Sequence, residues 1–260
     1  MTESNMYLQI ILNKYAPRTL DGYLLEIAAL KSGLENWAST CFISIVNSGS
    51  RAKGTAISLA SDVDYLISLK SDCNANSGGL KSIYDSLHTH LKGNYNPVRK
   101  QNVSFRIKIG NLEVDITPAR KHSGNTNDHW LYVSKLDTWK QTNIQKHISD
   151  ISGCGRLNEI KLLKIWRELN VLDFPSIYLE YLTINTLSGN SKDADKLADN
   201  FFFLLQELGK DTSNPLNSRI VDPANTNNIL SELLNPNEKK VIISKAKISA
   251  GQQYWKDIVW

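Results

Sequence analysis

Short apolar and β-branched runs in the first half of the chain predict strands. Residues 42–46 and 62–67 are two such runs, and each is followed by small or polar residues. Residues 103–109 alternate between apolar and polar positions, and residues 112–116 return with the opposite phase after a Gly-Asn turn. The pattern therefore predicts a central sheet that contains one hairpin.

Apolar residues recur at helical spacing elsewhere, mostly in the second half. The expected helices cover residues 6–12, 19–40, 80–92, 158–169, 176–187, 193–209 and 237–258. Polar loops are expected at residues 72–79, 120–129 and 210–228, the second of them mobile. His88 and His90 lie on one expected helix and point in different directions, so a shared metal is not expected. A chain of 260 residues suits one large domain or two closely joined lobes.

Basic residues cluster in the part of the chain that contains the expected strands. The net charge is only +4, but basic pairs occur at residues 51/53, 99/100, 106/108 and 120/121. This clustering suits an anionic substrate such as a nucleoside triphosphate. A solvated basic face explains any single pair equally well.

The cysteines and the lengths of the apolar runs indicate the cellular compartment in which the protein is expected. Cys41, Cys73 and Cys154 are an odd, scattered set without a Cys-x-x-Cys motif, so reduced thiols are expected, with neither a disulfide nor a zinc site. No run reaches the length of a membrane span, and the polar N-terminus lacks a secretory pattern. These features favour a cytoplasmic protein without a membrane partner.

Carboxylates on the expected strands form a candidate metal site. Asp62 and Asp64 are two residues apart, so they project from the same face of their strand. Asp115 lies on the polar side of the hairpin's return strand, between Val114 and Ile116. Adjacent carboxylates repel each other unless a cation lies between them. A sheet that brings the three aspartates together would hold two Mg²⁺ ions, or Mn²⁺ in their place.

A turn with small residues follows the first expected strand. Gly49 lets a ligand approach the backbone, and Ser50 offers a hydroxyl. Phosphoryl transfer needs a cradle for a polyphosphate next to carboxylates that hold cations. Gly49 and Ser50 are therefore candidate triphosphate-binding residues, and the three aspartates are candidate catalytic residues and metal ligands.

The order of these motifs resembles that of a known superfamily, the polymerase-beta-like nucleotidyltransferases. The motifs in question are Gly49-Ser50, Gly54-Thr55, Asp62-x-Asp64 and Asp115. Four further segments look like the branch that holds the bacterial cGAS/DncV-like nucleotidyltransferases (CD-NTases) and the oligoadenylate synthetases. They are Val114–Ala119, Trp139–Asn143, Leu162–Trp166 and Val221–Asn225. The resemblance covers residues 43–250.

The resemblance implies an α+β, two-lobed nucleotidyltransferase fold. It implies a catalytic lobe with a mixed β-sheet and a long spanning helix over residues 1–135. A helical lobe would follow over residues 136–260, with the active site in the cleft between the two lobes.

The resemblance also implies triphosphate contacts in the helical lobe. Lys164 matches a phosphate-binding position, and Lys161 lies on the same side of its helix. The alternative for Lys164 is an ion pair with Glu168, four residues further on. Ser176 opens the next helix as an N-cap candidate, and related enzymes have a serine there that contacts the triphosphate. Ile177 follows it, where some relatives have an aromatic residue that stacks on a nucleobase.

Three functions fit these features. The resemblance implies a template-independent, metal-dependent enzyme that joins nucleoside triphosphates into a cyclic or short linear oligonucleotide signal and releases pyrophosphate. The signal would serve antiphage defence through an effector that reads it, and nucleic acid would not be required. The alternative is a nucleotidyltransferase that modifies a macromolecule, either a tRNA 3′ end or, like some toxins, a protein hydroxyl. The third is a non-catalytic nucleotide-binding sensor, against which the complete aspartate set argues.

Overall fold

The computed structural model describes residues 2–60, 63–124 and 126–260, and the chain folds into two compact units. The sheet unit comprises Arg18–Lys53 and Ser61–Ile148, and the helical unit comprises Met1–Pro17, Gly54–Ala60 and Ser149–Trp260. This division differs from the expected boundary after residue 135. The N-terminal helix and the short segment after the Gly49 turn group with the C-terminal half of the chain.

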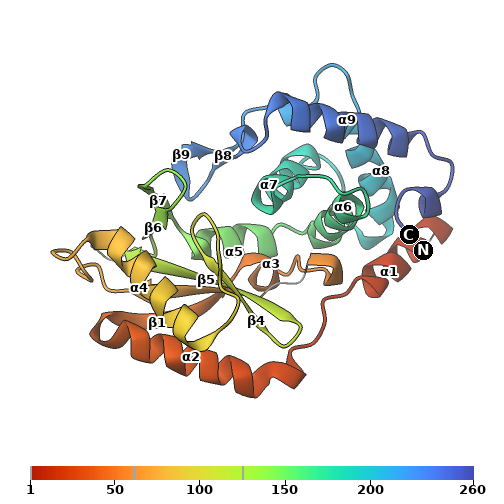
Figure 1. Cartoon of the computed structure of the whole chain (residues 1–260). Helices are drawn as coiled ribbons and strands as arrows, with labels where there is room; N and C mark the ends of the chain where they lie inside the picture. Colours follow the sequence, from red (N-terminus) through yellow and green to blue (C-terminus); the bar gives the residue numbers. More distant parts are fainter. Residues whose placement is uncertain (1, 61–62, 125) are drawn as a thin grey trace. The chain divides into compact units, whose positions relative to one another are not determined.

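The described part of the sheet unit forms one seven-stranded mixed sheet (Figure 1). Its main path runs in the order β1-β2-β5-β4-β3, and β6 pairs with both β5 and β7. Strands β2 and β5 are parallel, and the other pairs are antiparallel. The strands are β1 (Phe42–Ser48), β2 (Val63–Leu69), β3 (Arg99–Lys100), β4 (Phe105–Ile109), β5 (Leu112–Lys121), β6 (His129–Val133) and β7 (Thr138–Thr142). The mixed sheet confirms the expected α+β class.

Two helices share an apolar core with this sheet. α2 (Leu24–Ala38) and α4 (Gly79–Asn94) place Leu34 and Leu87 in one buried cluster with Val114 and Ile116 of β5. His88 of α4 stacks on Phe105 of β4, with the ring centroids 5.2 Å apart. The alternation along β5 therefore leaves Asp115 on the sheet face away from this core.

The helical unit is built around α6, whose Trp166 is fully buried. Its helices are α1 (Glu3–Lys14), α6 (Leu157–Leu169), α7 (Ser176–Thr186), α8 (Leu197–Leu208) and α9 (Pro236–Ala250). The two ends of the chain lie together (Figure 1), and the Tyr7 hydroxyl donates to the Val259 carbonyl at 2.9 Å. The short strands β8 (Val221–Asp222) and β9 (Asn225–Ile229) form a second small sheet. None of the described helices has the length and apolar character needed to cross a bilayer.

Several element boundaries differ from the expectations. The first long helix starts at Leu24, after a 3₁₀ turn at Asp21–Tyr23, and the last helix ends at Ala250. The loop expected at 120–129 is shorter, because β5 extends to Lys121 and β6 begins at His129. Pairing with β6 supplies hydrogen bonds to this end of β5, which local polarity does not reveal. α5 (Ile144–Ser152) contains the last of the sequence boundaries between the two units, which lies between Ile148 and Ser149.

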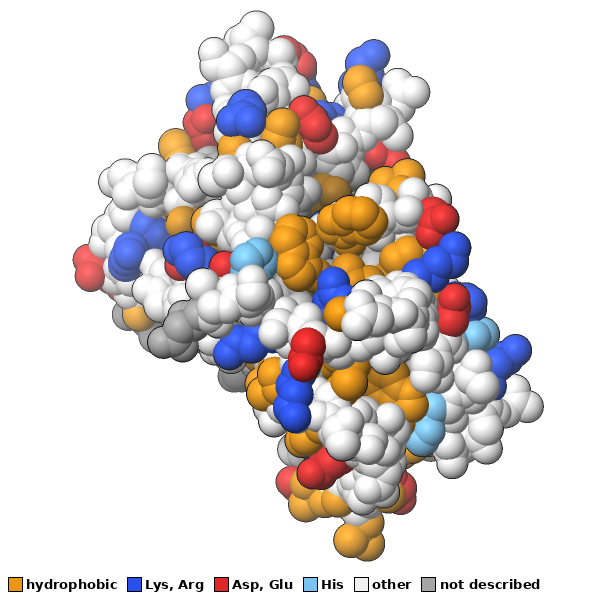
Figure 2. Space-filling view, turned by 90° about the vertical axis from the view of Figure 1, so that its left-hand side faces the viewer, with side chains coloured by type: hydrophobic (Ala, Val, Ile, Leu, Met, Phe, Trp, Pro, Cys, Tyr) orange, Lys and Arg blue, Asp and Glu red, His pale blue; other side chains and the backbone are white. Residues whose placement is uncertain are grey.

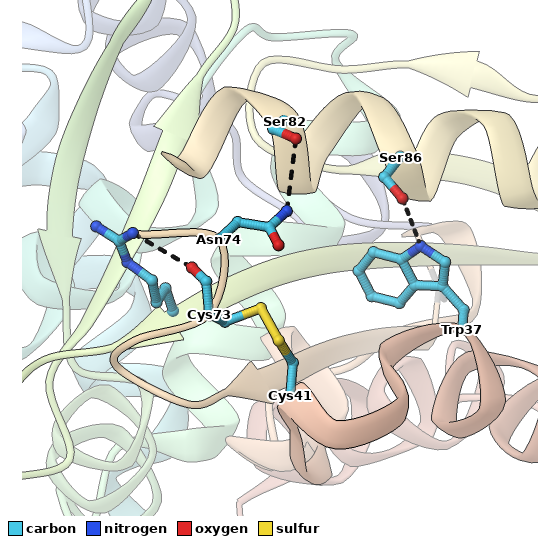
Figure 3. Close-up of a disulfide and its surroundings, with 7 residues drawn as sticks. Trp37, Cys41, Cys73, Asn74, Ser82 and Ser86 are labelled. Carbon is cyan, nitrogen blue, oxygen red and sulfur yellow. Dashed lines mark hydrogen bonds between the residues drawn. A yellow bond between two sulfur atoms is a disulfide. The ribbon is translucent and has the colours of Figure 1, made fainter. Parts of the chain in front are cut away.

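The expectation of reduced thiols is wrong for two of the three cysteines. Cys41 and Cys73 form a disulfide, with their Cα atoms 5.5 Å apart (Figure 3). The antiparallel β1/β2 pairing brings them together, because Phe42 lies opposite Leu69 and the chain then turns through Lys70. A separation of 32 residues gives no hint of this pairing. Cys154 is a free thiol.

Candidate functional site

Two of the three candidate carboxylates lie side by side in the sheet. β2 and β5 are parallel neighbours, and Asp64 lies directly opposite Asp115 in their register. Neighbouring strands are about 4.8 Å apart, so the two side chains leave the same face of the sheet close to each other. The prediction that the strand of Asp115 lies beside the strand of Asp64 is therefore confirmed. Asp62 lies outside the described residues.

The turn after β1 closes onto the Asp64 carboxylate. Ser48 is the register partner of Asp64, and Gly49 follows with φ +65° at the start of α3 (Gly49–Ala52). A Cβ atom on residue 49 would lie 1.8 Å from Asp64 Oδ2, which no side chain tolerates. Glycine is thus required here by Asp64 itself as well as by the backbone conformation. Ser50 is the next residue of this short helix and is half-buried.

Arg51, a cation in this turn, interacts electrostatically with Asp64. Burial lowers the pKa of the Arg51 guanidinium, a neighbouring Arg18 lowers it further, and the charge of Asp64 opposes both. Arg51 Nη2 donates to the Arg18 carbonyl at 3.0 Å. The turn therefore places positive charge near the carboxylates, as an anionic substrate requires.

Arg106 holds the Asp115 carboxylate through two hydrogen bonds. Arg106 Nε is 2.7 Å from Asp115 Oδ1, and Arg106 Nη2 is 2.7 Å from Oδ2. The same guanidinium donates to Glu113 Oε2 at 2.7 Å, and Gln101 Nε2 donates to Asp115 Oδ1 at 3.2 Å. This fork geometry fixes the plane of the carboxylate.

Arg106 was not among the site residues expected from the sequence, although the sequence pattern contains the signal. A two-residue turn at Gly110-Asn111 pairs Ile109 with Leu112 and, three steps on, Arg106 with Asp115. Counting outward from that turn places the arginine opposite the aspartate.

The donor set on this face fits divalent cations. Asp64 and Asp115 offer hard carboxylate oxygens, which Mg²⁺ and Mn²⁺ prefer. Each carboxylate has about four lone-pair sites, so Asp115 can accept from Arg106 and still ligate a cation. No cluster of three or more metal-ligating side chains occurs within 2–60, 63–124 and 126–260, a set that does not include Asp62.

Lys164 lies in a buried ionic cluster within the helical unit. Its side chain is 2% exposed, and Nζ donates to Glu180 Oε1 at 2.7 Å and to Thr55 Oγ1 at 2.9 Å. Thr55 in turn donates to Glu180 at 2.7 Å. The alternative pairing with Glu168 is wrong, because Lys164 pairs with Glu180 and Glu168 pairs with Arg167, at 2.6 Å. A triphosphate contact for Lys164, and for the half-buried Lys161, stays a prediction.

The start of α7 differs by one position from the expectation. Pro175 occupies the N-cap, and Ser176 is the first residue inside the helix, so the N-cap assignment for Ser176 is wrong. The Ser176 hydroxyl accepts from Arg167 Nη1 at 2.9 Å, and its predicted triphosphate contact is untested. Ile177 packs partly buried against the helical core. Tyr178 is buried, which raises its pKa to about 12, and its hydroxyl donates to the Leu216 carbonyl.

No family model matches the sequence, and no curated protein sequence matches it either. Solved structures do match the fold. CdnC of E. coli MS115-1, in a complex with HORMA-deltaN, superposes with a TM-score of 0.70 at 20% identity, over 95% of this chain and 89% of that chain. The CD-NTase CdnG of Bradyrhizobium diazoefficiens, in complex with GTP, gives 0.73 at 10% identity, over 95% and 91%.

A third match is the cyclic dinucleotide synthase CdnE of Elizabethkingia meningoseptica, with GTP and Apcpp. Its TM-score is 0.66 at 12% identity, over 94% of this chain and 98% of that chain. The fold of this chain is therefore that of the CD-NTases. The fold that the ordered motifs implied is confirmed, at identities too low to transfer an activity by themselves.

Proposed function

We propose that this protein is a nucleotidyltransferase that joins nucleoside triphosphates into a cyclic or short linear oligonucleotide. One observation carries the proposal. Asp64 and Asp115 lie in register on adjacent parallel strands, with a glycine turn packed against Asp64. The similar structures include CdnC with ATP and CdnG with GTP, which supports nucleoside triphosphates as substrates.

The candidate site residues have separate roles in the proposed reaction. Asp64 and Asp115, together with Asp62, would hold two divalent cations, which supply charge neutralisation to the triphosphate. The Ser50 hydroxyl binds a phosphate oxygen, and Lys164, Lys161 and Ser176 are proposed further triphosphate contacts. An acceptor hydroxyl forms the new bond to the α-phosphorus, the bond to the leaving pyrophosphate breaks, and Asp115 takes the hydroxyl proton. Arg106 orients the Asp115 carboxylate for this step.

The proposed signalling role rests on analogy of fold alone. We propose that the oligonucleotide is read by an effector protein in antiphage defence, and that neither template nor nucleic acid is required for synthesis. Modification of a tRNA 3′ end or of a protein hydroxyl is the competing outcome of the test below.

The test is synthesis from labelled nucleotides. The purified protein is incubated with Mg²⁺ or Mn²⁺ and each labelled triphosphate, treated with phosphatase, and its products are separated. Asp64→Asn keeps the volume of the side chain but removes its charge, so we expect about a thousandfold loss of product, because a metal ligand contributes several kcal/mol. Asp85→Asn is the matched control, since this exposed carboxylate on α4 pairs only loosely with Lys100, at 3.8 Å.

Two results would contradict the proposal. One is full activity in a folded Asp64→Asn protein. The other is label that appears only after tRNA or a protein acceptor is added, which would establish the macromolecule-modifying function instead.

A further inference from the structure

A cavity of about 500 Å³ opens in the sheet unit between the start of α4 and the β6/β7 hairpin. Its volume lies within the range typical of small-molecule sites. Nothing in the proposed reaction uses it. In Figure 2, which faces the left-hand side of Figure 1, apolar side chains gather in the middle of the surface, with Lys, Arg and His side chains beside them.

Three aromatic side chains form one wall of the cavity. Trp130 and Tyr132 are two residues apart on β6, so they share a face of the strand, and Trp139 of β7 is the register partner of Tyr132. Trp139 is 64% exposed, which is unusual for a tryptophan that has no partner to bind. These rings offer a flat apolar surface on which a planar base can stack.

Positive charge lies at the same cavity. Arg120, near the end of β5, also lines it, and its Nη1 donates to the Cys73 carbonyl at 3.4 Å. That contact leaves most of the guanidinium donors for an anion. Lys81, by contrast, is paired with Asp137 at 3.0 Å, and the Tyr132 hydroxyl donates to the same Asp137 oxygen. Arg120 is therefore the cation best placed for a phosphate.

This cavity is separate from the candidate catalytic carboxylates. Arg120 and Asp115 are five residues apart on β5, and the register with β2 is unbroken from Val114 to Arg120. An odd separation puts their side chains on opposite faces of the sheet, and five residues span about 16 Å along a strand. A ligand in the cavity therefore does not displace a substrate at Asp64 and Asp115.

We infer that this cavity is a second nucleotide-binding site, in which the base stacks on Trp130 and Trp139 and a phosphate binds Arg120. Aromatic stacking combined with a guanidinium is the chemistry with which proteins bind nucleotides without reading their sequence. A free triphosphate and a short oligonucleotide product share this chemistry. The site thus gives the protein a place to sense its own substrate or product.

The location is tested by photo-cross-linking with 8-azido-ATP, followed by peptide mass spectrometry. The reaction is run with EDTA, so that binding that needs a divalent cation is removed. We expect label in the peptide that contains residues 130–139, also in an Asp64→Asn protein that makes no product. Label confined to residues 42–69 and 105–118 would overturn the inference without touching the proposed function.

The affinity is tested with variants that leave the core intact. Trp139→Ala removes an exposed ring and Arg120→Gln removes the charge, and each should weaken ATP binding in EDTA roughly tenfold. Trp260→Ala is the matched control, because that tryptophan is 47% exposed and belongs to the helical unit. Equal ATP affinities of Trp139→Ala and Trp260→Ala would overturn the inference.

Competition identifies the source of the ligand. The competitor is present before irradiation. Stronger protection of residues 130–139 from labelling by ATP than by the dinucleotide pApA supports a substrate sensor, and the reverse supports a product sensor. Displacement only by single strands longer than about four nucleotides, the lower end of single-strand site sizes, would overturn the inference in favour of a nucleic-acid surface.

Discussion

The sheet unit and the helical unit place their charged groups in different environments. In the sheet unit, the Arg106 and Asp115 side chains are 20% and 12% exposed and form a bidentate pair. In the helical unit, the Lys164 and Glu180 side chains are 2% and 0% exposed. Arg156 is likewise buried there, and it donates to Glu159 and to the Ser191 and Leu187 carbonyls.

This difference separates structural charges from reactive ones. Separation of a buried pair such as Lys164–Glu180 leaves a charge in a low-dielectric interior, so a stabilising role of Lys164 competes with the triphosphate contact proposed for it. A pair that reaches solvent, such as Arg106–Asp115, can accept a cation or a substrate group as an additional partner. The helical unit therefore uses charge to fix its core, and the sheet unit keeps charge available for chemistry.

The largest expected effect comes from breaking the buried pair. Lys164→Met takes the lysine cation away from the Glu180 carboxylate, which is 0% exposed, so we expect a loss of about 3–5 kcal/mol in the free energy of unfolding, measured by urea denaturation. Lys161→Met on the same helix is the control and should change this value little. Weaker nucleotide binding without a change in stability would make Lys164 a triphosphate contact, as its motif implied.

The second test removes the covalent link in the sheet unit. The Cys41–Cys73 disulfide closes a loop with a sequence separation of 32, so Cys73→Ser should lower the free energy of unfolding by about 2–4 kcal/mol. Cys154→Ser controls for the loss of a thiol. If dithiothreitol left the thermal midpoint of the wild-type protein unchanged, the bond would be irrelevant to its stability.

The smallest effect on stability is expected at Arg106. Arg106→Met breaks a largely buried bidentate pair and should lower the unfolding free energy by about 1.5–3 kcal/mol, the usual range for hydrogen bonds to a charged group. The Arg106 cation repels a divalent cation at Asp115, so its removal should lower the Mg²⁺ concentration that gives half-maximal synthesis. A repulsion of about 1.4 kcal/mol corresponds to a roughly tenfold lower concentration. Lys108→Gln, which affects an exposed lysine 3.9 Å from Glu113, is the control. A requirement for more Mg²⁺ in Arg106→Met would show that the arginine assists rather than opposes the cation.

The local sequence pattern was sufficient to predict much of the sheet unit and one central helix of the helical unit. The alternation through residues 103–116 predicted β4, β5 and the polar position of Asp115, because the period of a strand is set by its own residues. The same reasoning located α6 to within one residue of Leu157. The two-residue turn also determines that Arg106 lies opposite Asp115, since the strands of a tight hairpin cannot shift relative to each other.

Contacts between distant residues were decided by the tertiary structure alone. Thr55 and Glu180 lie far from Lys164 in the sequence, yet both bond to it, because α6 and α7 bury their polar groups against the segment after Gly54. Cys41 meets Cys73 only because β1 returns along β2. Such partners depend on which surfaces the packed chain brings together, and a buried charge or thiol takes whichever group then lies within reach. The sequence determined which residues carry the chemistry, and the packing determined which of them are held in the interior.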